Sequence, residues 1–363
     1  MKKISIKWLW LIVIGLWLII IGALSYSIIK KYTEVHLETI GYWHETEGNI
    51  TEVLYAGEEK DTAGIKLDVQ MIQYDSHEEK RFKDLIENFD DYKLKAGNDC
   101  LSVTESGIRA VKPGWCPIFL EKDYRDTDNL KHRIQACIGL YLVIDEKYEG
   151  FRVITTPDEF CTLLSDNPYG RFILGNDLDF TGVELQITGF KGVLINPYQY
   201  KMKNIKADYP LLGTNSGAYY DGLNIENCRI DDNRQALWYF PIFTDFGASR
   251  YRTIFKNMKI VDLHIINESK DCQFYTCRDN SFIVDSEINI YVETSENTKH
   301  TEIFPFGGGT QIINSVSKIE VTGPNASKVS VNVLSNLVAD SKIILEGKEY
   351  SISSEEKFSY TFS

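Results

Sequence analysis

The chain has 363 residues, of which 43% are hydrophobic and 25% charged, a composition typical of a globular protein. Acidic residues outnumber Lys and Arg by 52 to 39, so the formal net charge is −13. The segment 1–29 contains three lysines and no acid, which leaves 36 bases against 52 acids, or −16, on the remainder. A body this acidic is a poor candidate for binding nucleic acid or a polyanionic polysaccharide, because both need a cationic surface.

Residues 8–29 form an uncharged apolar stretch, with Trp8 and Trp10 at one end and Lys30 and Lys31 following the other. As an α-helix, 22 residues span about 33 Å, enough to cross a hydrocarbon core of about 30 Å. The three lysines and the α-amino group before this stretch favour an N-terminus in the cytoplasm. We therefore expect a cytoplasmic tail and transmembrane anchor over residues 1–31, in contact with the lipid bilayer, and an extracellular body.

A cleaved signal peptide is the alternative interpretation of the same segment. Ala23-Leu24-Ser25 has the small-x-small pattern of a cleavage site, and cleavage would release the body as a secreted protein. The apolar region of a cleaved signal is usually about 7–15 residues long, shorter than the stretch here. The length therefore favours a retained anchor, and under both interpretations the body is exported.

Residues 32–150 predict a small α+β extracellular region. The alternation of apolar and polar residues over 64–74 indicates a half-buried strand. Apolar residues three and four apart indicate a helix within 76–95. We further expect a short helix over 129–138 and a strand over 138–144.

A capping motif marks the start of a different region. Thr156 stands at the N-cap position, Pro157 at the first helical position and Glu159 at the third, which is the capping-box arrangement. The motif predicts a short helix over 157–164, and a strand-like run follows over 171–176. We expect this helix to cover the N-terminal end of whatever fold comes next.

From about residue 200 the chain repeats an apolar anchor, a small polar turn and a strand centred on isoleucine. The anchors recur at a nearly constant interval of roughly 31 residues, which is typical of a solenoid. Short β-branched runs between Asn, Asp, Gly and Ser favour a parallel β-helix among the solenoids. The fold class predicted is thus mainly β: a right-handed parallel β-helix over 151–350, with 351–363 as a C-terminal cap or tail. The aligned anchors are Leu212, Phe243, Tyr275, Phe306 and Leu334.

Two stretches of this region resemble a known family. Residues 170–180 read GRFILGNDLDF, and residues 210–230 read PLLGTNSGAYYDGLNIENCRI. The chain over about 151–345 thereby resembles the β-helix repeat region of Gram-positive surface proteins, found in the non-catalytic N-terminal region of immunoglobulin-A protease-like zinc metalloproteases and in GLUG-type repeats. This resemblance implies a β-helix at a bacterial cell surface. The positions that match the family pattern are Asp177, Leu178, Asp179, Phe190 and Gly192.

Motifs for several kinds of catalysis are missing from the sequence. No two of the six histidines are four residues apart, so the zinc-protease motif is absent, as are a P-loop and a Gly-x-Ser-x-Gly element. No cofactor is expected, and the sequence favours a non-enzymatic protein while leaving the question open. Asp221, Asp231 and Asp232 are weak catalytic candidates, because paired carboxylates perform glycoside hydrolysis.

Other candidate binding residues are aromatic or acidic. Aromatic side chains that can stack on sugar rings or form a protein-binding patch are Tyr198, Tyr200, Tyr219, Tyr220, Trp238 and Tyr239. Their alternative role is partial burial in a coil corner. Asp177 and Asp179 are weak candidates for a calcium site, with turn formation as the alternative.

Three functional hypotheses remain from the sequence. The first is a non-enzymatic binding, adhesion or spacer module at the bacterial cell surface, whose partner is a glycan or a protein. The second is a carbohydrate-active β-helix enzyme, a glycosidase or a lyase. The third is an accessory subunit of a membrane or envelope complex.

Overall fold

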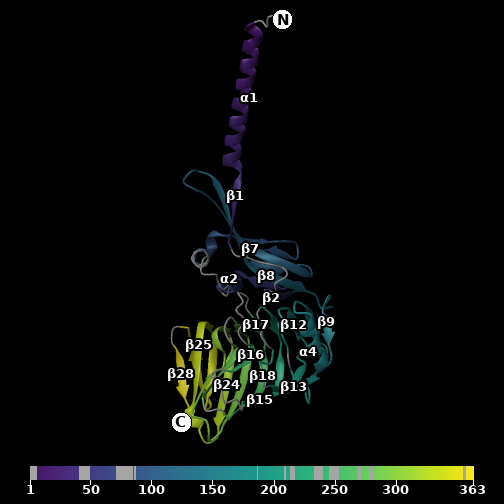
Figure 1. Ribbon diagram of the computed structural model, residues 1–363, viewed down its shortest axis with the longest axis vertical. Helices are drawn as coiled ribbons and strands as arrows, with labels where there is room; N and C mark the ends of the chain where they lie inside the picture. The colour runs from purple at the N-terminus through teal and green to yellow at the C-terminus, as the bar shows by residue number, and fades with distance from the viewer. Residues whose placement is uncertain are drawn as a thin grey trace.

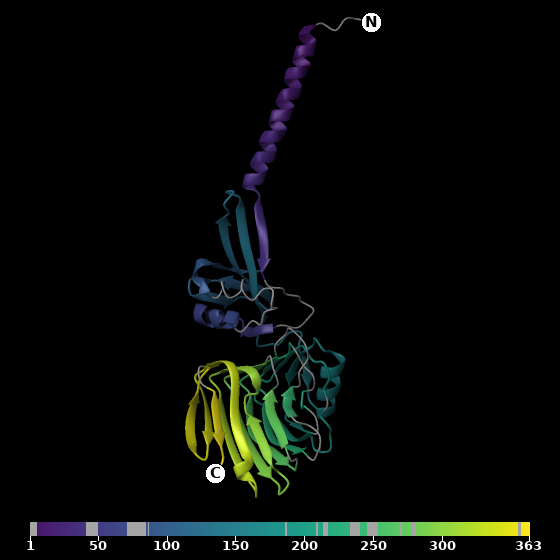
Figure 2. The same cartoon turned by 60° about the vertical axis from the view of Figure 1, so that its left-hand side comes forward.

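The N-terminal helix α1 (Ile6–Thr33) projects away from the rest of the chain in the computed structural model of this protein (Figures 1 and 2). The segment Val13–Thr33 is long and apolar enough to cross a membrane, and none of it is buried inside the described structure. Trp17 is 61% exposed and Leu18 65% exposed. A helix that is apolar on all sides needs apolar surroundings. The prediction of an exposed apolar N-terminal helix is confirmed, and such a helix fits a signal anchor or a signal peptide.

The structure describes most of the chain. The described residues are 6–40, 50–70, 85, 87–185, 187–207, 210–212, 217–232, 240–244, 253–268, 271–277, 281–354 and 357–363.

An N-terminal domain follows α1 and lies between it and the remaining strands (Figure 2). One sheet, called sheet A, has the order β1-β8-β7-β4, and β2 also pairs with β8. Its strands are β1 (Val35–Ile40), β2 (Ile50–Tyr55), β4 (Lys93–Ala96), β7 (Gly114–Arg125) and β8 (Lys131–Ile144). The domain also contains a three-stranded sheet and helix α2 (Thr62–Gln70). The strands of that sheet are, in order, β3 (Glu59–Asp61), β6 (Gly107–Ala110) and β5 (Leu101–Val103). Together with sheet A they form a hydrophobic core that is separate from that of the remaining strands.

Several predicted elements of this domain are wrong. The strand predicted over 64–74 is helix α2 up to Gln70, because Ile65, Asp68 and Val69 are all buried, which is the spacing of one helical face. The helix predicted over 129–138 is extended from Lys131 onward, as part of β8, in which burial alternates over residues 135–140. The strand predicted over 138–144 is confirmed.

The helix predicted over 76–95 lies partly outside the described residues. Within the described part, residues 85 and 87 are helical, as predicted, whereas Phe89–Asp91 is a single 3₁₀ turn and β4 (Lys93–Ala96) is extended. The prediction is therefore wrong for the end of this segment.

The C-terminal half consists of long parallel sheets stacked on one another, consistent with a β-solenoid (Figure 1). Sheet C contains β9 (Arg152–Ile154), β10 (Arg171–Leu174), β12 (Val193–Ile195), β14 (Tyr219–Asp221), β17 (Thr253–Lys256), β20 (Ser281–Val284), β23 (Gly308–Ile313) and β25 (Val329–Ala339). Sheet D contains β11 (Leu178–Asp179), β13 (Lys201–Ala207), β15 (Asn224–Asp232), β18 (Lys259–Asn267), β21 (Glu287–Thr294), β24 (Val316–Thr322), β26 (Ser341–Leu345) and β27 (Lys348–Ile352). A third series, sheet E, contains β16 (Phe240–Thr244), β19 (Asp271–Cys277) and β22 (His300–Phe304), and continues into β25.

Both ends of the solenoid carry additional elements. At the C-terminal end, β27 pairs antiparallel with β26, and β28 (Phe358–Thr361) pairs antiparallel with β25. Helix α4 (Pro157–Asp166) begins where the sequence predicts, since the Thr156 hydroxyl accepts a hydrogen bond from the Glu159 backbone at 3.2 Å. The Glu159 carboxylate reaches back to the backbone N–H of Thr155 at 2.8 Å, one residue before the N-cap.

Coil length varies more than the predicted period. In sheet D, Met202, Ile225 and Ile260 are paired inward residues of successive coils, and the second step is half as long again as the first. Tyr275 pairs with Phe304 and not with the predicted anchor Phe306. The near-constant anchor spacing is therefore wrong in detail, because the longer step also includes β16, the first strand of sheet E.

One corner between sheets C and D repeats the same backbone conformation in five successive coils. Only Gly, Asn and Asp adopt this left-handed conformation readily. The amide of Asn257 donates to Asp221 at 2.8 Å, and that of Asn314 to Asp285 at 2.7 Å. Hydrogen bonds between coils thus reinforce the corner. Its left-handed positions are Gly222, Asn257, Asp285, Asn314 and Asp340, with φ of 77°, 50°, 49°, 45° and 49°.

A column of buried serines lies beside this corner. The backbone N–H of Ser286 donates to the Ser315 hydroxyl at 3.1 Å, and that of Ser315 donates to the Ser341 hydroxyl at 3.0 Å. We expect Ser315→Ala to lower the free energy of unfolding by about 1–3 kcal/mol, because the buried N–H of Ser286 loses its acceptor. Urea unfolding followed by circular dichroism measures this change, with the exposed Ser351→Ala as control. Equal midpoints for the two variants would contradict the expectation.

Candidate functional site

Asp177 and Asp179 bind protein donors at a coil corner. Asp177 accepts the backbone N–H of Lys201 at 2.8 Å and the ammonium of Lys203 at 2.9 Å. Hydrogen bonds from Asn204 and Thr181 lower the pKa of Asp179 to about 2. These contacts link neighbouring coils, which favours the turn-forming role of both residues over the predicted calcium site.

The three predicted catalytic aspartates lie on two different sheets. Asp221 ends β14 in sheet C, whereas Asp231 and Asp232 end β15 in sheet D. Burial raises the pKa of Asp221, whose carboxylate accepts the Asn257 amide in the corner described above. The side chains of Asp231 and Asp232 lie outside the described residues. The backbone therefore gives no support to one catalytic group made of all three.

The predicted aromatic residues do not form one exposed patch. Tyr219 and Tyr220 are fully buried, and Tyr220 stacks on Phe255 in the solenoid core with ring centroids 5.1 Å apart. This burial corrects their interpretation as surface ligand-binding residues, because neighbouring residues of a strand face opposite sides and both sides are covered here. Tyr198 is exposed, and its ring centroid lies 5.7 Å from that of the half-buried Tyr200. Trp238 and Tyr239 lie outside the described residues.

The outer face of sheet C is covered by the N-terminal domain. Residues of both domains share one buried apolar cluster, which we call the domain junction. Burial of this apolar area stabilises the contact and fixes the two domains against each other. Its buried members are Val53, Leu142 and Ile144 from sheet A, and Ile173, Val193, Ile195, Tyr219, Ile254 and Phe282 from the solenoid.

A charged network lies at the edge of the junction. The Glu52 carboxylate contacts the ammonium groups of Lys60 at 3.1 Å and Lys256 at 2.6 Å, and accepts the Tyr219 hydroxyl at 3.0 Å. Glu52 and Lys60 are each only 14% exposed. Burial opposes ionisation of Glu52, but the two lysines together hold its pKa below the ordinary value. The network joins the N-terminal domain to β17 of the solenoid.

Asp68 extends this network. It contacts Lys60 at 2.6 Å and accepts the hydroxyl of Tyr141. Burial raises the pKa of Asp68 to about 6, although the nearby ammonium of Lys60 lowers it. Despite their own burial, Lys60 and Lys256 have raised pKa values because of the acids beside them. Ammonium groups stabilised in this way are unsuited to act as a base or nucleophile, so the network fits a structural role.

The Asp68 carboxyl predicts a pH effect on stability. Its pKa of about 6 in the folded chain exceeds the ordinary value of 3.8, so the folded state binds its proton more tightly. Raising the pH from 4 to 6 therefore lowers the contribution of this group to stability, by about 3 kcal/mol at most. We expect wild type to lose stability over this range relative to Asp68→Asn, as measured by urea unfolding at several pH values. Parallel pH profiles of the two proteins would contradict this.

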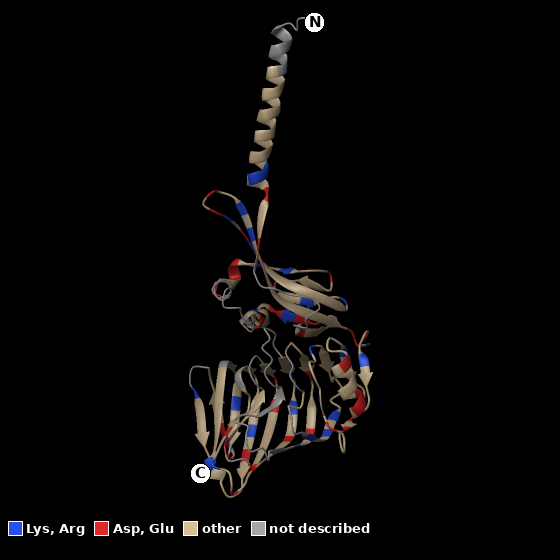
Figure 3. Ribbon diagram, in the orientation of Figure 1, with Lys and Arg blue, Asp and Glu red and all other residues tan. Residues whose placement is uncertain are grey.

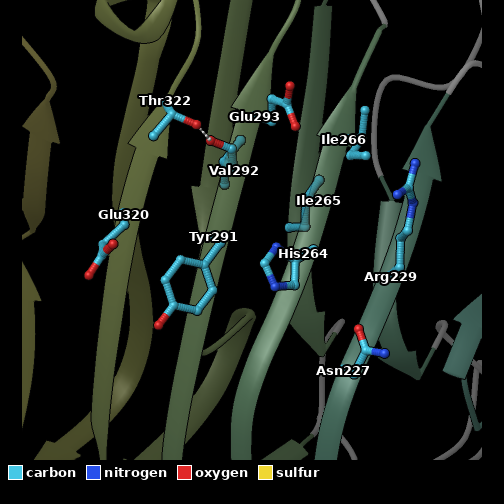
Figure 4. A pocket seen from close by; sticks show the side chains of 10 residues that line it. All are labelled: Asn227, Arg229, His264, Ile265, Ile266, Tyr291, Val292, Glu293, Glu320 and Thr322. Carbon is cyan, nitrogen blue, oxygen red and sulfur yellow. Dashed lines mark hydrogen bonds between the residues drawn. The ribbon is translucent and has the colours of Figure 1, made fainter. Parts of the chain in front are cut away.

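A groove of about 370 Å³ lies on the outer face of sheet D (Figure 4). Four of its residues occupy the same register position in successive coils: Arg229, His264, Tyr291 and Glu320. We call this series the groove ladder. The rings of His264 and Tyr291 are nearly parallel, at 18°, with centroids 5.1 Å apart. Glu293 lines the groove one outward position further along β21.

The sequence analysis missed the groove ladder. Its residues are unevenly spaced along the chain, and only the strand register aligns them. The sequence contained one signal for these residues: in each isoleucine-rich strand, the residues that alternate with the inward isoleucines face outward. Figure 3 shows that charges of both signs are distributed over the solenoid, and that basic residues mark the foot of α1.

The chain was compared with known proteins at the level of families, curated sequences and solved structures. No protein-family model, no curated protein and no solved structure matches it significantly.

Proposed function

We propose that the protein is a membrane-anchored extracellular module of the bacterial cell surface, in which a right-handed parallel β-helix displays a rigid binding face. The observation that carries the proposal is α1: an apolar helix that is not buried against the body over Val13–Thr33, with Lys30 and Lys31 in its last turn. The retained helix would hold the body outside the membrane. The excess of negative charge on the body then serves solubility and spacing from the anionic surface.

The rigidity of the body supports a binding, adhesion or spacer role. The solenoid core is continuous from Ile154 to Phe362, and the domain junction fixes the N-terminal domain to it. Hinge motion between domains is expected where an interface is small and polar, and this junction is mainly apolar. A rigid two-domain body is suited to present a surface at a fixed distance from a membrane.

A carbohydrate-active enzyme is the second candidate function. Glu293, Glu320 and His264 line one groove, as the enzyme hypothesis requires of acid and base groups. If this hypothesis holds, Glu293→Gln abolishes hydrolysis of an oligosaccharide while leaving its binding measurable. Intact oligosaccharide after prolonged incubation with wild type would favour the non-enzymatic module. The third hypothesis, an accessory subunit, predicts loss of function when α1 is replaced by an unrelated apolar helix.

Membrane extraction and intact mass test the anchor. In a Gram-positive host we expect the full chain to remain in membranes after alkaline carbonate washing, and its mass to include residues 1–31. Deletion of residues 1–33 removes the export signal together with the anchor, so the body should appear in the soluble cytoplasmic fraction. A mature chain that begins after Ala23-Leu24-Ser25 would contradict the anchor and support secretion.

A further inference from the structure

The groove ladder combines an aromatic surface with polar groups on both sides. Neighbouring strands are about 4.8 Å apart, so its four positions span about 14 Å. His264 and Tyr291 form the middle of the ladder, with Arg229 on one side and Glu320 on the other (Figure 4). Aromatic rings offer apolar area to the C–H faces of a ligand, and charged side chains form strong hydrogen bonds with hydroxyl groups.

Hydrogen-bonding capacity in the groove is available to a ligand. Among the described residues, no hydrogen-bond partner is found for the Tyr291 hydroxyl, the His264 ring nitrogens or the Glu293 carboxylate. Glu293 is exposed, while Tyr291 is half-buried, which holds its ring in place. Three different polar groups therefore face the groove with donors and acceptors available.

The charge of the groove favours a neutral ligand. The groove lining carries one base, Arg229, and two acids, Glu293 and Glu320, and Glu320 is itself paired with Lys318 of the same strand at 2.6 Å. A polyanion would meet both carboxylates, and a polycation would meet the guanidinium of Arg229. Neither is electrostatically complementary to the groove.

The strand pairing disfavours an extended peptide. Strands β15, β18, β21 and β24 are each hydrogen-bonded to a neighbour on both sides. Recognition of a peptide by strand addition needs a free sheet edge, which these four strands lack. The groove instead offers side chains only, arranged along the stack of coils.

We propose that this groove binds a short neutral oligosaccharide, with a sugar ring against Tyr291 and hydroxyl groups hydrogen-bonded to Glu293 and His264. The inference deepens and rests on the proposed function, because it names the ligand class of the surface that the module displays. The groove volume of about 370 Å³ is within the usual range for small-ligand sites, about 300–1,000 Å³.

Calorimetric titration of the full chain in lipid nanodiscs tests this proposal. Nanodiscs avoid sugar-based detergents, which would compete for the groove. The probes are neutral tetrasaccharides of glucose, N-acetylglucosamine, mannose and xylose. We expect at least one to bind with one site per chain, and Tyr291→Ala and Glu293→Gln to weaken binding at least tenfold. Tyr169→Ala, which removes an exposed tyrosine outside the groove, is the matched control and should change affinity less than twofold.

One further variant separates loss of folding from loss of sugar binding, and one further measurement separates failure of the anchor from failure of sugar binding. Tyr291→Phe retains the ring and removes the hydroxyl, so it tests the site if Tyr291→Ala unfolds. Absence of binding by every probe overturns the proposal. Loss of affinity in Tyr198→Ala, at the exposed tyrosine that the sequence analysis named as a candidate, with none in the Tyr291 and Glu293 variants overturns it as well. Retention of the chain in the nanodisc is recorded in the same samples, so failure of the anchor is distinguished from failure of sugar binding.

Discussion

Glu52→Ala should lower the free energy of unfolding by about 3–5 kcal/mol, because it leaves the ammonium groups of Lys60 and Lys256 poorly solvated and without their shared carboxylate. The Tyr219 hydroxyl loses its acceptor in the same substitution. Since these groups come from both domains, we expect the N-terminal domain to separate from the solenoid before the solenoid unfolds. Urea unfolding followed by circular dichroism measures the loss, and limited proteolysis detects the released domain.

A surface ion pair provides the control for this prediction. Glu349 pairs with Lys342 at 3.0 Å, and both side chains are well exposed. Exposed pairs of this kind contribute about 0–1 kcal/mol, so Glu349→Ala should leave stability nearly unchanged. Equal effects of Glu52→Ala and Glu349→Ala would show that the network does not couple the domains.

Phe255→Ala should destabilise the solenoid by about 3–5 kcal/mol, the usual cost of removing a fully buried aromatic ring. The ring of Phe255 is fully buried in sheet C and stacks on Tyr220 of the preceding coil at 8°. Its removal leaves a cavity between two coils, and neighbouring backbones cannot close it without breaking the strand register. Urea unfolding measures the change, and Phe255→Leu should recover more than half of the loss. A loss below about 1 kcal/mol would mean that the coils are less tightly packed than the structure indicates.

The sequence predicted the solenoid because each coil repeats the same local chemistry. Isoleucines face inward, Asn and Asp occupy left-handed corners, and the capping box at Thr156 marks the start of α4. Coil register was not predictable, since turns of unequal length separate the strands and only backbone pairing aligns them. In the N-terminal domain, Ile65 and Val69 are four residues apart, and this spacing places them on the same side of either a strand or a helix. Alternation alone therefore did not distinguish helix from strand.

The junction and the groove depend on contacts distant in sequence. Glu52 and Lys256 are 204 residues apart, and no local pattern indicates that they meet. The sequence suggests a surface position for Tyr219 because the domain that covers it is encoded much earlier in the chain. The groove ladder likewise required the register, although the outward position of His264 follows from the alternation within its strand.

Labelling of an engineered cysteine in intact cells tests the central claim most directly. Lys348, exposed in β27 of the solenoid, is replaced by cysteine, and cells of a Gram-positive host are treated with a membrane-impermeant maleimide. Wild type, with its native cysteines, provides the background. An extracellular body anchored by α1 predicts strong labelling of Lys348→Cys in intact cells, with the labelled chain in the membrane fraction. Labelling only after cell lysis would contradict the account.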